Sequence, residues 1–215
     1  MEKERARLTY AFDAYCGWCY GFGPALRRFA ADNAARVDIR VLSGGLFLGD
    51  RAAPLAAHPY IPAANERIAQ LTGAVFGDAY RELLADGSAV MDSAGPAVGL
   101  VALRRQAPER QVEFAGAVQQ AFYRDGRDLS APETYRTLAE RLGLDPDAVT
   151  AALADPAVRE EAAREMRETR RLGVQGYPTL LLHTPAGGVR RLGGPVASSD
   201  DLTAALEQHL AAGTA

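Results

Sequence analysis

The feature that most constrains this chain is a pair of cysteines placed between a predicted strand and a predicted helix. Cys16-Gly-Trp-Cys19 contains the only two cysteines of the 215 residues. Residues 8–13 form a short apolar run typical of a buried strand, and from Trp18 to Ala34 the apolar positions recur at helical spacing. We therefore expect Cys16 at a helix N-terminus, where backbone N–H groups and the helix dipole favour a negatively charged sulfur.

This placement predicts a reactive dithiol in which each sulfur has its own role. Thiolates rather than thiols attack disulfides, and cysteines at helix N-termini have pKa values lowered from about 8.5 to roughly 3.5–7.5. Cys16, at the exposed end of the helix, is predicted as the nucleophile. Cys19 lies one turn inside and is predicted to resolve the mixed disulfide. A bond between the two sulfurs closes too short a loop to stabilise the fold much, so a structural disulfide is disfavoured.

Two other interpretations of the cysteine pair are weaker. The thiols could be inert and buried, or they could form half of a zinc site. Zinc normally takes four protein ligands in structural sites. The histidines, His58, His183 and His209, show no ligand spacing to the cysteines or to one another. We therefore predict no metal and no cofactor.

The rest of the chain predicts an α/β protein with a long helical segment in its middle. Residues 37–42 alternate as a second strand, which completes a strand–helix–strand unit with parallel strands. Between residues 45 and 173 nearly all signals are helical. The clearest helices are expected over residues 97–105, 112–123, 133–142 and 158–172.

Several residues predict where helices start or bend. Ser130 and Glu133 have the spacing of a capping box, and Asp145 and Asp155 each precede a proline that suits a first helical turn. Pro24 is expected to lie inside the first helix, because the apolar spacing continues past it.

Strand signals return near the end of the chain. Residues 179–183 and 189–192 are expected to form a hairpin around Gly187-Gly188. Ser198 is then expected to cap a last helix over residues 200–210, with Asp201 in the capping-box position.

Charge and hydropathy exclude several classes of partner. The formal net charge is −3, which gives no overall attraction to nucleic acid or to anionic membranes. No window approaches 18 uncharged apolar residues, and residues 1–7 lack the apolar run of a secretory signal. We therefore expect a cytoplasmic protein that binds neither nucleic acid nor membrane.

The segment Cys16-Gly-Trp-Cys-Tyr-Gly-Phe22 resembles the DsbA family of thiol–disulfide oxidoreductases, specifically its cytosolic FrnE-like branch of predicted disulfide isomerases. Segments at residues 71–77, 92–93, 120–130 and 173–179 resemble that branch in the same order. The resemblance implies a thioredoxin-like fold with a large all-helical domain inserted between its βαβ half and its ββα half. Residues 1–44 and 174–215 would form the thioredoxin-like domain and residues 45–173 the insertion.

The same resemblance implies a substrate site. Pro178, after Tyr177, would be the cis-proline beside the cysteine pair, and its missing N–H would leave neighbouring backbone groups free for an extended substrate. Gly17, Trp18, Tyr177 and Pro178 are thus the expected substrate-binding residues, with Trp18 partly exposed. The implied activity is disulfide exchange in protein or peptide substrates, with glutathione or a thioredoxin-type protein as possible electron donor.

The sequence also departs from the best-known members of this group. The dipeptide between the cysteines is Gly-Trp, whereas the oxidising periplasmic enzymes have Pro-His and thioredoxin has Gly-Pro, so the reduction potential does not follow from the motif. Tyr10 stands six positions before Cys16, where those proteins carry a buried acid. Asp13 lies closer and is expected mainly to shape the loop, with proton transfer as a second possibility.

Two alternative functions remain. Kappa-class glutathione transferases and chromene-carboxylate isomerases share the helical insertion, but they have a serine in place of Cys16 and lack the second cysteine. A non-catalytic redox sensor would use the same thiols as a switch. Repeated turnover on disulfides separates a catalyst from such a sensor.

Overall fold

The two cysteines lie where the first strand of the main sheet passes into the first helix. The computed structural model describes residues 5–212. Strand β1 (Ala6–Phe12) pairs in parallel with β2 (Val37–Ser43) and antiparallel with β5 (Thr179–His183), and β5 pairs antiparallel with β6 (Val189–Gly193). The sheet order is β2-β1-β5-β6, so strands from the two ends of the chain lie side by side.

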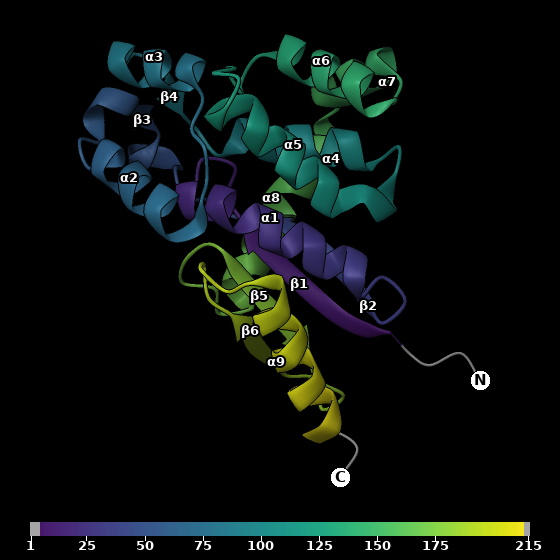
Figure 1. Ribbon diagram of the computed structural model, residues 1–215. Helices are drawn as coiled ribbons and strands as arrows, with labels where there is room; N and C mark the ends of the chain where they lie inside the picture. Colours follow the sequence, from purple (N-terminus) through teal and green to yellow (C-terminus); the bar gives the residue numbers. More distant parts are fainter. Residues whose placement is uncertain (1–4, 213–215) are drawn as a thin grey trace.

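Helix α1 (Gly17–Asp32) connects β1 to β2 and completes the predicted βαβ unit. Its buried side chains recur at helical spacing and include Cys19, Phe22 and Leu26. The helix continues through Pro24, as predicted. Helix α9 (Ser199–Ala212) packs beside α1 below the helical block (Figure 1).

Helix α8 (Pro156–Arg171) is tied to the outer strand β2 by polar contacts. Arg40 of β2 forms an ion pair with Glu168, and the Thr169 hydroxyl donates to the Ser43 carbonyl at 3.3 Å. Arg104 lies between the helices and β2: it donates to the Val41 carbonyl and forms a buried ion pair with α8. These contacts join the helical segment to the sheet.

The segment between β2 and β5 is mainly helical and forms the upper part of the molecule in Figure 1. Besides α8, its helices are α2 (Ile61–Thr72), α3 (Asp78–Asp86), α4 (Ala94–Arg104), α5 (Gln111–Tyr123), α6 (Pro132–Leu142) and α7 (Pro146–Ala154). One correction applies to its predicted all-helical character. Two short strands, β3 (Ala53–Pro54) and β4 (Val90–Met91), pair antiparallel within it, because a two-residue ladder leaves no periodic signal.

Three of the four predicted helix caps are confirmed. The Asp145 and Asp155 carboxylates accept hydrogen bonds from the first backbone N–H groups of α7 and α8. Ser198 and Asp201 form the predicted reciprocal box before α9. The Ser130 cap is wrong: α6 begins at Pro132 with Ala131 as its N-cap, and the Ser130 hydroxyl donates to Asp128 at 2.7 Å instead.

The other predictions about the fold are in part confirmed and in part untested. The strands and the four clearest helices lie within a few residues of their predicted ranges, whereas α2 and α3 were not predicted. The division at residues 44/45 and 173/174 into two domains stays a prediction. The prediction that residues 1–7 lack a secretory signal includes residues 1–4, which lie outside the described residues.

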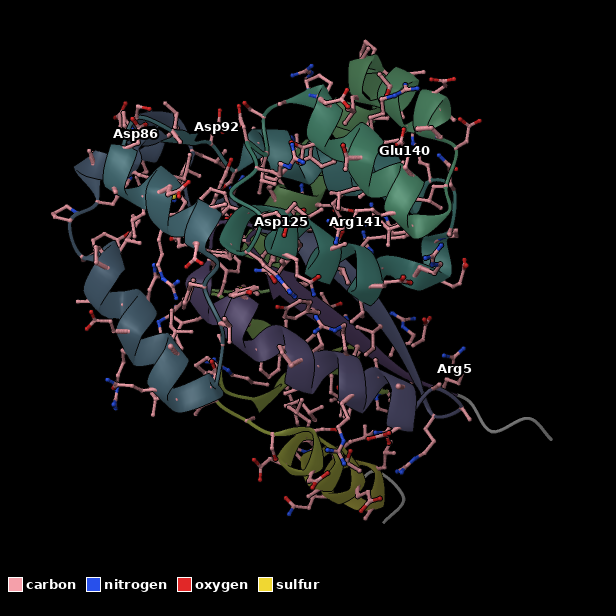
Figure 2. All side chains as sticks on the ribbon, turned by 45° about the horizontal axis from the view of Figure 1, so that its top comes forward. Arg5, Asp86, Asp92, Asp125, Glu140 and Arg141 are labelled. Atoms are coloured by element: carbon pink, nitrogen blue, oxygen red, sulfur yellow. The ribbon has the colours of Figure 1, made fainter. Side chains whose placement is uncertain are left out.

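Charged side chains project from the outer faces of the helices, as Figure 2 shows. Arg141 of α6 and Asp125 form one such ion pair, at 2.9 Å. Within residues 5–212, no helix is both long and apolar enough to cross a bilayer.

Candidate active site

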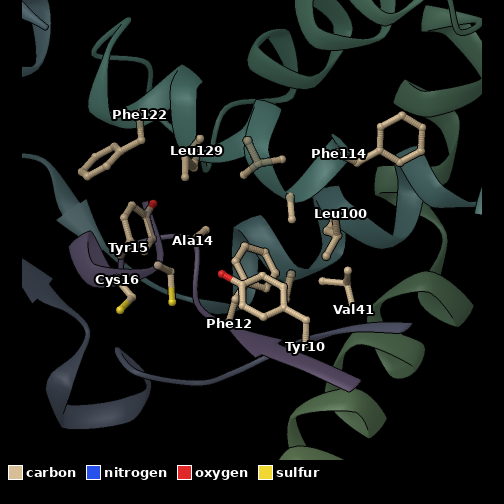
Figure 3. Packing of buried hydrophobic residues seen from close by; sticks show 14 of the residues in the cluster. Tyr10, Phe12, Ala14, Tyr15, Cys16, Val41, Leu100, Phe114, Phe122 and Leu129 are labelled. Carbon is tan, nitrogen blue, oxygen red and sulfur yellow. The ribbon is translucent and has the colours of Figure 1, made fainter. Parts of the chain in front are cut away.

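Cys16 occupies the N-cap of α1, so its sulfur lies at the positive end of the helix. Its backbone N–H donates to the Asp13 carbonyl at 3.0 Å, and its own carbonyl accepts from the Tyr20 N–H at 3.1 Å. The first turn of α1 carries no acidic residue, so no side-chain charge there opposes a thiolate. Both cysteines are free thiols. Figure 3 shows Cys16 at the edge of the buried cluster, next to Tyr15 and Ala14.

The two thiols differ in accessibility. Cys16 is 5% exposed, whereas Cys19 is completely buried. Burial raises the pKa of the Cys19 thiol well above its ordinary value, and the neighbouring Cys16 raises it further. Cys19 therefore stays protonated in the resting dithiol, and a reagent from solution meets Cys16 first.

The loop before β5 lies against Cys16. The Tyr177–Pro178 peptide bond is cis. The Cys16 thiol donates to the Tyr177 carbonyl at 3.3 Å, which joins residues 161 positions apart. The Tyr177 ring packs directly on Gly44, where an added Cβ would lie 2.3 Å from the ring, and its hydroxyl accepts from the Gly45 N–H at 3.4 Å. The end of β2 thus holds the Tyr177 side chain in place.

Asp13 shapes the loop between β1 and the cysteines, as the sequence predicted. Its carboxylate accepts from the Tyr15 N–H at 3.0 Å and from the Leu46 N–H at 2.9 Å. Burial raises the pKa of Asp13, and these backbone hydrogen bonds oppose that rise. The link to Leu46 was not predicted, because it joins segments that are distant in sequence.

Gln119 of α5 supports the same loop from the helical segment. Its buried amide donates to the carbonyls of Asp13 and Cys16 at 3.3 and 3.4 Å. Gln119 was not predicted, since a single polar residue in an apolar helix carries no signal for its partner.

Helix α2 packs closely against the start of α1 and forms one wall beside the cysteines. A Cβ added at Gly17 would lie 2.8 Å from Ile68, and one at Gly21 would lie 2.7 Å from the Thr72 hydroxyl. A larger residue at either position would force these side chains to shift, so glycine favours this close approach. The packing against α2 is therefore a structural reason for glycine at position 17, in addition to the predicted contact of Gly17 with substrate.

The other predicted residues are distributed around this centre. Trp18 is partly exposed beside the cysteines, as expected, and Phe22 is buried in the core. His58 packs edge-on against Phe47 and Tyr60, in the segment before α2. The described residues contain no group of three or more His, Cys, Asp or Glu arranged to hold a metal ion.

A groove of about 320 Å³ follows the loop that ends in Tyr177 and Pro178. It is lined by residues 172–179 together with Leu181, Arg191 and Pro195. Arg191 donates to the Gly193 carbonyl at 3.0 Å and approaches the Pro178 carbonyl at 3.5 Å. Tyr177, which contacts the Cys16 thiol, is therefore part of the lining of this groove. Arg191 gives the groove a positive charge.

Comparisons with known proteins agree with this geometry. The cytosolic disulfide reductase DsbM from Pseudomonas aeruginosa is 33% identical, with 95% of this chain and 98% of that chain covered and a TM-score of 0.80. A candidate protein disulfide isomerase from Nitrosomonas europaea has a TM-score of 0.82 at 20% identity, with 96% and 98% covered. No curated protein sequence matches the chain.

The alternative with a serine in place of Cys16 also has a structural counterpart. A 2-hydroxychromene-2-carboxylate isomerase has a TM-score of 0.59 at 18% identity, with 95% of this chain and 94% of that chain covered. At this identity the likeness concerns the fold alone. The model of the DSBA-like thioredoxin domain, in contrast, matches residues 7–206. The chain therefore belongs to the DSBA-like thioredoxin family and has the fold of a thiol–disulfide oxidoreductase.

Proposed function

We propose that this protein reduces or isomerises disulfides in peptide or protein substrates in the cytoplasm, with Cys16 as nucleophile and Cys19 as resolving residue. The observation that carries the proposal is the asymmetry of the dithiol. One sulfur belongs to the N-cap residue of α1 and donates to the Tyr177 carbonyl, while the other is completely buried one turn inside the helix.

The reaction follows from that asymmetry. The Cys16 thiolate attacks one sulfur of a substrate disulfide, a Cys16–substrate disulfide forms, and the other substrate sulfur leaves as a thiolate. Cys19 then loses its proton and attacks the Cys16 sulfur. The Cys16–Cys19 disulfide forms, and the second substrate sulfur leaves and takes up a proton. The substrate gains two electrons and the dithiol loses two.

We propose that Trp18, Gly17, Tyr177 and Pro178 contact the substrate around Cys16. Trp18 is partly exposed beside the nucleophile, and the Tyr177 carbonyl lies 3.3 Å from the Cys16 sulfur. The inserted helices contribute α2 as a wall of the same site. In this proposal the helical insertion, residues 45–173, acts as a domain that shapes substrate access.

Glutathione is the thiol that we propose regenerates the dithiol. A structure of DsbM contains glutathione, and that protein is 32% identical to this chain. Glutathione is a short peptide with two carboxylates, and Arg191 supplies a guanidinium in the groove beside Tyr177. Arg191→Gln should raise the KM for glutathione, whereas the adjacent Arg190→Gln, which does not line the groove, should leave it unchanged.

The direct test of the function is turnover on a fluorogenic disulfide-linked peptide in glutathione buffer. Wild-type protein should cycle repeatedly, and Cys16→Ser should lose turnover. Retained turnover in Cys16→Ser would contradict the proposed mechanism. A single stoichiometric reaction without cycling would favour the redox sensor. Glutathione transfer that persists without either thiol would favour the transferase alternative.

A further inference from the structure

We propose that Tyr10 is a positioning residue whose hydroxyl stabilises the Cys19 thiolate while that sulfur resolves the mixed disulfide. The inference rests on the proposed function and concerns its second step. It starts from a polar group of β1 that makes no hydrogen bond of normal geometry with the described residues.

The Tyr10 hydroxyl is buried and poorly paired. The residue is 2% exposed, and its oxygen makes no hydrogen bond of normal distance and angle with the residues that the structure describes, although it interacts with the Cys19 side chain. Its ring is fixed by Phe12 and Phe22, whose ring centroids lie 5.6 and 6.0 Å away. Figure 3 shows the hydroxyl turned toward the end of the cluster that contains Cys16. A buried hydroxyl without a well-formed hydrogen bond destabilises a protein, so its presence here calls for a use.

The groups that face this hydroxyl define that use. Burial raises the pKa of Tyr10 well above its ordinary value, and the charges of Cys19 and Cys16 and a hydrogen-bond interaction with the Cys19 side chain raise it further, while Arg27 opposes the rise. Tyr10 therefore keeps its proton and acts as a hydrogen-bond donor rather than as a base. A backbone hydrogen bond from Asp13 lowers the pKa of Cys19, whereas the charge of the Asp13 carboxylate raises it and so disfavours a thiolate there. A donor next to Cys19 offsets both that charge and the burial.

The resolving step is where this donor matters. Before the step, Cys16 is bonded to the substrate sulfur and Cys19 carries its proton. When Cys19 gives its proton to solvent water, its thiolate forms in a fully buried place, and the phenol O–H can donate to it. As the Cys16–Cys19 bond forms, the charge passes to the departing substrate sulfur, and Tyr10 is left poorly paired again. The hydroxyl thus stabilises the Cys19 thiolate of the intermediate more than it stabilises the resting dithiol.

Tyr10→Phe tests the proposal because it removes the hydroxyl and keeps the ring. A mixed disulfide of Cys16 with glutathione would be formed on the reduced protein by rapid mixing with glutathione disulfide, and release of the second glutathione would be followed against pH. Hydrogen bonds to charged groups imply that this release slows about ten- to hundredfold and that its pH profile moves to higher pH. Attack by Cys16 should keep the wild-type rate.

Tyr135→Phe is the matched control. Its hydroxyl is equally buried, but it donates to the Leu129 carbonyl at 2.8 Å, away from the cysteines. Tyr135→Phe should lower the free energy of unfolding and leave resolution unchanged. Tyr10→Phe should slow resolution and leave the stability of the reduced protein nearly unchanged, because no hydrogen bond of normal geometry is lost.

Each other outcome overturns the inference. Wild-type resolution with an unchanged pH profile in Tyr10→Phe would show that the hydroxyl has no part in the step. Slower resolution together with lower stability and an unchanged pH profile would show a structural role only. If the wild-type protein formed no mixed disulfide at Cys16, the proposed function would fail first. Formation with normal resolution in Tyr10→Phe would overturn this inference alone.

Discussion

The sheet and the helical segment treat buried tyrosine hydroxyls differently. In the helical segment Tyr135 donates to a backbone carbonyl, and the Tyr80 hydroxyl accepts from Asn65 at 3.1 Å. In the sheet the Tyr10 hydroxyl makes no hydrogen bond of normal geometry with any described residue, and it interacts with the Cys19 side chain. These two tyrosines of the helical segment therefore use their buried hydroxyls for stability. The buried Tyr10 hydroxyl near the cysteines lacks such a partner among the described residues, and it can therefore take part in the reaction.

Two further groups sharpen the contrast. Asp13 and Cys19 are both buried, and burial raises the pKa of each. Neither forms an ion pair with a residue that the structure describes, whereas the buried Glu165 of α8 is paired with Arg104. Changes in the helical segment should thus appear mainly as lost stability, and changes around the cysteines mainly as lost turnover.

The largest expected effect is on stability. Phe114 of α5 is completely buried, and Phe114→Ala should lower the free energy of unfolding by roughly 3–5 kcal/mol, because it leaves a cavity. Urea unfolding would measure this loss. Val75→Ala, at a position 72% exposed, should change stability by no more than about 0.5 kcal/mol. Near-equal effects of the two substitutions would contradict the packing described for α5.

Next in size is an effect on activity from the end of β2. Gly44→Ala would place a Cβ against the Tyr177 ring and displace the loop that contacts Cys16. Misplaced site residues commonly lower turnover about ten- to hundredfold, and we expect a loss of that order in the peptide assay. Gly194→Ala is the control, since its Cβ would meet no atom within 4 Å. Full activity in Gly44→Ala would show that the Tyr177 position is unimportant.

A smaller effect concerns the pH dependence of stability. Since burial raises the pKa of Asp13, the folded protein holds that proton more tightly than the unfolded chain. The resulting stabilisation is complete below the ordinary aspartate pKa of about 3.9 and is lost as pH rises through the folded value. Asn cannot ionise, so Asp13→Asn should gain stability relative to wild type as pH rises across that window.

The exposed Asp201 supplies a control of opposite sign for this measurement. Hydrogen bonds from Ser198 lower the pKa of Asp201, so its contribution is present above the ordinary aspartate pKa and is lost as pH falls. Urea unfolding at several pH values should therefore show opposite trends for Asp13→Asn and Asp201→Asn. Parallel trends would contradict the burial of Asp13.

The smallest effect tests a helix cap. Ser198→Ala removes a hydroxyl that accepts from the Asp201 N–H, and such losses typically lower stability by about 1 kcal/mol. Ser130→Ala removes a hydroxyl that caps no helix and should have a smaller effect. A larger loss from Ser130→Ala would show that the helix starts are assigned wrongly.

The sequence was informative where local chemistry decides the structure. Cys16 and Cys19, the βαβ unit and the Asp145 and Asp155 caps depend on neighbours in the chain and were predicted. The Ser130 cap failed because Asp128, two residues earlier, competes for the same hydroxyl. Local patterns cannot rank two such partners.

The contacts that hold the site residues in place could not be predicted either, and the reason is different. Gly44 against Tyr177, Leu46 on Asp13 and Gln119 on the Cys16 loop are contacts between distant parts of the chain. They depend on how the sheet, the loop and α5 meet in three dimensions. Periodicity reports which face of an element is buried, but it does not report what that face contacts.

The central claim is the division of labour between the two cysteines, and trapping the mixed disulfide tests it most directly. Cys16→Ser and Cys19→Ser would each be reacted with glutathione disulfide, and the adducts would be located by peptide mass spectrometry. The account predicts a stable glutathione adduct on Cys16 of Cys19→Ser and almost none on the buried Cys19 of Cys16→Ser. Equal adduct formation on both cysteines would contradict it.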